Sequence, residues 1–239
     1  MPVERRGEVA SAGVSRRDLL AGLGACGLLA GGWGGLLSGL IAAPARDDEG
    51  LDRQILQTAS SLEVLAVATY SAALSLDFIR NGNPVIARFV QTAMIHHDEH
   101  RKAFQALTKT LGGTEQANPN PTFAPVVEQA RPSLRTAVEM VTLAETLETV
   151  VTQTYLQNAS QLDHAGARRL AASVMGVESQ HAATLRTMKV LLEAGLPDLL
   201  KIPLDADLAR VPAQAGGTAF PEPFEPVTNV AEPASGAVA

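Results

Sequence analysis

The sequence predicts an all-α protein whose main domain is a bundle of four long helices. Apolar residues make up 46% of the 239 residues and aromatic residues only 4%, which is typical of helical proteins with an aliphatic core. Apolar residues recur at spacings of three and four along four stretches of about 30 residues each. Two short turns and one long connection separate these stretches, so we expect two antiparallel helical hairpins joined by a crossover.

The first hairpin is expected over residues 51–80 and 84–111. The sequence Asn81-Gly82-Asn83-Pro84 interrupts the apolar pattern between its two helices and predicts a tight turn. Pro84 suits the first turn of the second helix, where a backbone N–H has no partner within the helix. Gly112-Gly113 then ends that helix.

The second hairpin follows a connection from Thr114 to Pro132 that carries four prolines. A connection of about 20 residues is long enough to travel the length of the bundle, which a plain up-down-up-down layout would not need. Ser133 is the predicted N-cap of the third helix. The turn Asp163-His164-Ala165-Gly166 separates this helix from the fourth, which ends near Gly195.

Residues 1–45 are predicted to be an export signal and not part of the bundle. Arg16-Arg17 precedes an apolar, glycine-rich run, and Ala43-Pro44-Ala45 offers a small-x-small cleavage site. This arrangement resembles a twin-arginine signal, which implies export of an already folded protein across a bacterial cytoplasmic membrane, to the envelope or the outside. Two alternatives stay open: retention of residues 19–43 as a membrane anchor, and lipid attachment at Cys26.

The expected bundle domain covers residues 46–196, and residues 197–239 are expected to form a Pro-rich strap followed by a loose tail. The net charge is −6 and no basic stripe runs along the sequence, so we expect no nucleic-acid partner. Membrane contact is expected only through an uncleaved signal or a lipid anchor. A homodimer is left open.

Six polar residues interrupt the apolar faces near the middle of the four helices. In the second helix the apolar face continues through positions 93, 97, 100 and 104, which places His97 and His100 inward. Asp98 falls on the solvent side, and His96 and Glu99 fall on the flanks. The six inward residues are Glu63, His97, His100, Glu148, Glu178 and His181.

These six side chains predict a metal site. Burying a carboxylate costs on the order of several kcal/mol unless it is paired or metal-bound, and carboxylate and imidazole ligands without thiolate suit iron, manganese or zinc. The alternative is a polar centre satisfied by ion pairs and water. Glu145 and Asp77 lie near the inward faces but are expected on the flanks, whereas Tyr70 and Tyr155 either donate to the ligands or pack in the core.

An internal repeat links the first and third helices. Leu62-Glu63 is followed by Thr69-Tyr70 at the same spacing at which Leu147-Glu148 is followed by Thr154-Tyr155. Two related helical hairpins would produce such a repeat. Together with Glu178-x-x-His181, these glutamates resemble the ligand pattern of ferritin-like di-iron proteins.

The resemblance extends over residues 51–195 and, together with the export signal, suggests the exported bacterial ferritin-like domain proteins. It implies a ferritin-like four-helix bundle that binds one or two iron or manganese ions. It also implies a metal-dependent oxidoreductase that uses oxygen or peroxide. The alternative is a metal-free structural or stress-associated binding protein of the cell envelope.

His97 departs from the family pattern, in which the second helix carries Glu-x-x-His and that Glu bridges two metals. This chain has His97-Asp98-Glu99-His100 instead. The resemblance therefore implies three carboxylates where the family has four, with Glu178 as the single natural bridge. A dinuclear centre, a single metal and an asymmetric pair all stay open at this point.

Overall fold

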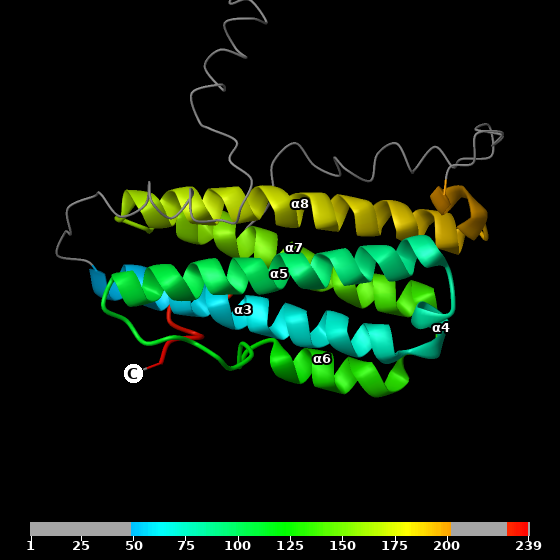
Figure 1. Ribbon diagram of the computed structural model, residues 1–239, viewed down its shortest axis with the longest axis horizontal. Coiled ribbons are helices and arrows are strands. Elements are labelled where there is room, and N and C mark those ends of the chain that lie inside the picture. The colour runs from blue at the N-terminus through cyan, green and yellow to red at the C-terminus, as the bar shows by residue number, and fades with distance from the viewer. Residues whose placement is uncertain (1–48, 202–228, 239) are drawn as a thin grey trace, which may run out of the picture. The chain divides into compact units, whose positions relative to one another are not determined.

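The computed structural model describes residues 49–201 and 229–238, and four long helices form a bundle there (Figure 1). Every regular element in these residues is helical, so the predicted all-α class is confirmed. α3 packs along α5 and α7 packs along α8, which gives the two predicted hairpins. The long helices are α3 (Glu49–Ser75), α5 (Pro84–Thr110), α7 (Ala137–Ala159) and α8 (Ala165–Glu193).

The turn of the first hairpin forms where the sequence places it, but the first helix is divided. Leu76 adopts an extended backbone (φ −74°, ψ 128°), so residues 51–80 form α3 and a separate short helix α4 (Asp77–Arg80). The Asn83 side chain caps α5 by accepting a hydrogen bond from the Val85 N–H at 2.9 Å. Pro84 is the first residue of α5, as predicted.

The prediction that Ser133 caps the third helix is wrong, because Thr136 does so. The Thr136 hydroxyl accepts from the backbone N–H of Glu139, and the Glu139 carboxylate accepts from the Thr136 N–H at 2.9 Å. This reciprocal capping box requires a Glu three residues after the cap, and the position three residues after Ser133 is a Thr. The hydroxyl of Ser133 instead bonds to the Ala130 carbonyl.

The crossover between the hairpins contains two short helices, α6 (Ala124–Ala130) and η1 (Arg131–Ser133), although the sequence predicted only a connection. Val127 of α6 is buried with Leu65 of α3 and Leu147 of α7. The crossover therefore lies along the α3 and α7 side of the bundle, with α6 beside α3 in Figure 1. A last short helix, η2 (Pro197–Lys201), follows α8.

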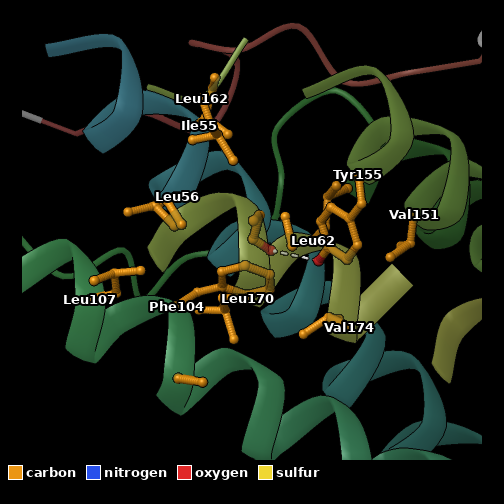
Figure 2. Packing of buried hydrophobic residues seen from close by; sticks show 14 of the residues in the cluster. Ile55, Leu56, Leu62, Phe104, Leu107, Val151, Tyr155, Leu162, Leu170 and Val174 are labelled. Carbon is orange, nitrogen blue, oxygen red and sulfur yellow. Dashed lines mark hydrogen bonds between the residues drawn. The ribbon is translucent and has the colours of Figure 1, made fainter. Parts of the chain in front are cut away.

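Two apolar clusters fill the bundle towards its two ends. The first joins the start of α3 to the end of α7, and Figure 2 shows Tyr155 and Val151 of α7 turned inward beside Leu62 in this cluster. The second joins the end of α3 to the start of α7, for example through Ala73 and Met140. This pairing of opposite ends means that α3 and α7 run antiparallel, with a polar layer between the clusters.

Residues 229–238 pack against the bundle, so the expectation of a loose tail is wrong for them. Ala231 is fully buried, and its N–H donates to the Thr154 hydroxyl of α7 at 3.0 Å. The Gly236 N–H donates to the Thr58 hydroxyl of α3 at 3.0 Å, and the Gln116 side chain donates to the Gly236 carbonyl at 2.5 Å. Polar side chains of three separate segments thus hold the end of the chain.

The predicted signal, residues 1–45, lies outside the described residues. Among the helices that the structure does describe, none combines the length and apolar character that crossing a membrane requires.

We expect Gly236→Ala to lower the free energy of unfolding by about 1–3 kcal/mol. A Cβ at Gly236 would lie against the Ser61 hydroxyl and 2.8 Å from the Thr58 Cα, so the terminal segment must shift. The matched control is Gly176→Ala in α8, where a Cβ meets nothing within 4 Å and should stabilise the helix by about 0.5–1 kcal/mol. Urea unfolding of both variants checks this, and equal stabilities for the two would contradict the described packing.

Candidate metal centre

The structure places the six predicted residues together in the polar layer at mid-bundle. Glu63 comes from α3, two histidines from α5, Glu148 from α7, and the last two from α8. All six side chains are buried, and His181 is the most exposed of them at 6%. Their helical spacing thus brings them inward as the apolar faces indicate.

His97 stands between the carboxylates of α3 and α7. Its Nδ1 lies 2.7 Å from Glu63 Oε2, and its Nε2 lies 3.0 Å from Glu148 Oε1. Glu178 Oε1 lies 3.5 Å from the same Nδ1. The residue that departs from the family pattern therefore occupies the centre of the cluster, with one nitrogen facing each of two glutamates.

Glu178 faces both remaining histidines with different oxygens. Its Oε1 lies 2.7 Å from His100 Nδ1, and its Oε2 lies 2.9 Å from His181 Nδ1. Glu148 Oε2 is 3.6 Å from His181 Nδ1. Glu178 is thus placed between the two halves of the cluster, as a bridging ligand would be.

The ligand atoms form two overlapping groups of four, and within each group they lie within 4.8 Å of one another. His97 and Glu178 belong to both groups. The first group adds Glu63 and His100, and the second adds Glu148 and His181.

The donor set fits a metal ion by two criteria. His100 Nδ1, Glu148 Oε2 and Glu178 Oε1 are buried and form no hydrogen bond of good geometry in the described part of the chain, although His100 Nδ1 and Glu178 Oε1 lie only 2.7 Å apart. Buried polar atoms are normally satisfied, and a cation at these atoms would satisfy them. Carboxylate oxygens and imidazole nitrogens without thiolate suit iron, manganese or zinc.

Two tyrosines hold the outer glutamates in place. The Tyr70 hydroxyl on α3 donates to Glu148 on α7, and the Tyr155 hydroxyl on α7 donates to Glu63 on α3. Burial and the facing carboxylate raise the pKa of both tyrosines well above 10, so the hydroxyls keep their protons and remain donors. Each tyrosine lies two turns after the glutamate of its own helix. Because α3 and α7 run antiparallel, that position is level with the glutamate of the other helix.

The imidazoles and carboxylates shift one another's pKa. Burial alone would raise the pKa of Glu63, but His97 and His100 outweigh burial and lower it to about 2. Burial alone would lower the pKa of His100 and of His181, but the negative carboxylates of the facing glutamates outweigh burial and raise each to about 9. Without a metal, these protonated imidazoles are the cations that neutralise the buried carboxylates.

His96 contacts the cluster, although the sequence indicated only a flank position. Its Nδ1 lies 3.0 Å from His181 Nε2, and the two rings are stacked with centroids 5.3 Å apart and planes at 10°. Burial and the neighbouring histidines lower the pKa of His96. The available signal was its position four residues before His100, one turn along the same side of α5.

Glu145 and Asp77 lie outside the cluster, as the sequence analysis expects. Glu145 pairs with Arg186 at 3.4 Å and with Lys189 at 3.3 Å between α7 and α8. Asp77 is exposed at the start of α4 and lies 3.4 Å from Arg80.

A four-helix bundle with a central layer of Glu and His is the architecture of ferritin-like proteins, and the comparison with known families agrees. A family model described as "Ferritin-like domain" matches residues 51–190, which is more than half of the chain, so the protein belongs to this family. Searches of curated proteins and of solved structures gave no match.

We expect the metal-free protein to lose stability as the pH rises from 6.5 through 9. His100 and His181 have pKa values raised from 6.5 to about 9 in the folded state, so their contribution is fully present below pH 6.5 and disappears as they deprotonate. The two rises together predict that the free energy of unfolding falls by on the order of 5 kcal/mol over this window.

Urea unfolding at pH 6.5 and 9.5 in the presence of a chelator measures this loss. Replacing both histidines with Gln should reduce the dependence, since neither position then titrates, although His97, whose pKa the facing glutamates also raise, remains. An equal stability of the wild-type protein at the two pH values would contradict the described charge arrangement.

Proposed function

We propose that the protein binds one or two iron or manganese ions at the six buried residues. The observation that carries this proposal is the pair of four-residue groups that share His97 and Glu178. Each group offers two carboxylates and two imidazoles, and the shared Glu178 directs one oxygen towards each group. Membership of the ferritin-like family supports iron or manganese as the metal.

His97 makes the two halves of the centre unequal. An imidazole nitrogen binds one metal, whereas a carboxylate at the same place would bridge two. His97 Nδ1 lies on the Glu63 side and Nε2 on the Glu148 side, so a single neutral His97 serves one group at a time. The two halves of the centre are therefore unequal, and one ion is expected to bind more tightly than a second.

Bound iron or manganese would supply electron transfer to oxygen or peroxide, and the proposed activity is that of a metal-dependent oxidase. The chain contributes the enclosure and orientation. Tyr70 and Tyr155 fix the outer glutamates, and the two apolar clusters keep water away from the ends of the centre. His181 is the most exposed of the six residues, at 6%.

A second candidate function is supported by the contacts of His97. Its two nitrogens already lie at hydrogen-bond distance from Glu63 and Glu148, so the polar layer holds together without a metal. This favours a metal-free structural or stress-associated binding protein of the envelope. Metal content separates the two functions.

We expect wild-type protein, reconstituted with Fe(II) without oxygen or with Mn(II) and then desalted, to retain one to two equivalents of metal. Glu178→Gln should reduce this below about 0.2 equivalents, because it removes the charged ligand that both groups share. The variant keeps the shape of the side chain, and circular dichroism checks that the bundle is intact. Elemental analysis gives the metal content.

The matched control is Glu145→Gln, which removes a carboxylate of α7 that pairs with Arg186 and Lys189 outside the centre. It should bind as much metal as the wild type. Less than about 0.2 equivalents in the wild-type protein would favour the metal-free function.

The protein is further proposed to be exported in folded form by residues 1–45. The support lies in the sequence, where Arg16-Arg17 stands before an apolar run and Ala43-Pro44-Ala45 follows it. An uncleaved anchor at residues 19–43 and a lipid at Cys26 are the competing fates of the same segment.

We expect Arg16→Lys/Arg17→Lys in the full chain to leave most of the protein in the cytoplasmic fraction of a bacterial host, because this pathway reads the arginine pair. Fractionation and immunoblotting measure the distribution. The upstream pair provides the control: Arg5→Lys/Arg6→Lys lacks the adjoining apolar run and should not change export. Equal export of the two double variants would argue against a twin-arginine signal.

A further inference from the structure

His96 contacts the centre from the flank of α5, and the ligand set does not include it. It is half-buried, and its Nδ1 lies 3.0 Å from Nε2 of His181. The ring of Phe89 meets the same His181 ring edge-on, with centroids 5.8 Å apart and planes at 86°. Two rings of α5 thus confine one ligand of α8.

The protonation of His181 follows from what its two nitrogens face. Nδ1 lies 2.9 Å from Glu178 Oε2 and 3.6 Å from Glu148 Oε2, so Nδ1 is the nitrogen that is directed at the metal centre. A neutral imidazole that binds a metal through Nδ1 carries its hydrogen on Nε2. That N–H is directed at His96 Nδ1.

We infer that His96 is a positioning residue of the metal centre, which accepts a hydrogen bond from His181 Nε2 and thereby fixes the ring orientation and tautomer of that ligand. The inference rests on the proposed metal-binding function. The second nitrogen of a metal-bound histidine usually donates to a carboxylate, a carbonyl or water. Here an imidazole takes this place and adds no negative charge to the centre.

The acceptor and the stacked ring are separable contributions of His96. His96→Phe keeps an aromatic ring against His181 but has no acceptor. His96→Asn loses the ring but places an amide oxygen close to the position of Nδ1. If His96 acts only by packing, the Phe variant should bind metal better than the Asn variant. If it positions His181, the Asn variant should bind metal better.

The test uses Co(II), whose visible absorption reports ligand number and geometry, with the full chain and a competing chelator of known affinity. His96→Phe should weaken Co(II) binding about 10- to 100-fold and alter the absorption spectrum. His96→Asn should stay within about threefold of the wild type with an unchanged spectrum. His164→Asn removes another half-buried imidazole, keeps a residue able to cap α8, and should bind as the wild type does.

The remaining outcomes contradict either the role of His96 or metal binding itself. Wild-type affinity and spectrum in His96→Phe would overturn the inference alone, as would an equal loss in the Phe and Asn variants. A wild-type protein that binds no Co(II) would overturn the proposed function and the inference with it.

Discussion

The burial of three carboxylates at the middle of the bundle is the constraint on which the rest of the structure depends. Glu63, Glu148 and Glu178 are at most 1% exposed, and a buried charge without a partner is strongly unfavourable. The three inward histidines face these carboxylates, and two tyrosine hydroxyls donate hydrogen bonds to the outer glutamates. A shift of any helix by one residue would move its Glu or His out of the polar layer. The polar contacts therefore also fix the register of the four helices.

The two hairpins place equivalent pairs of residues in the centre, and the difference between these pairs explains the charge of the centre. His97 and His100 of the first hairpin correspond to Glu178 and His181 of the second, each pair separated by three residues. A glutamate at the first position in both hairpins would give four carboxylates and two imidazoles. His97 changes this to three of each, so the centre of this chain can neutralise itself by protonation, and a metal must displace those protons to bind.

Helical spacing was sufficient to predict the four helices and the six inward residues, because position on an apolar face is a local property of each helix. The other features depend on contacts between elements. The hydrogen bonds from Tyr70 to Glu148 and from Tyr155 to Glu63 form only because α7 runs antiparallel to α3. His96 contacts the centre only because α8 brings His181 beside it. The packing of residues 229–238 depends on polar partners in other segments, such as Gln116, and no local pattern marks it.

Burial of the six side chains and the proposed export both affect which metal the proposed centre would bind. Affinity alone discriminates poorly among divalent metals, so the supply at the place of binding decides much of the selectivity. The six side chains are nearly inaccessible in the folded bundle, so metal uptake by the folded protein should be slow and uptake during folding faster. Under the proposed export of a folded chain, that step takes place in the cytoplasm, and the closed helices carry its metal outward. Because His97 makes the two halves of the centre unequal, the ion in the tighter half would be the one retained during transport.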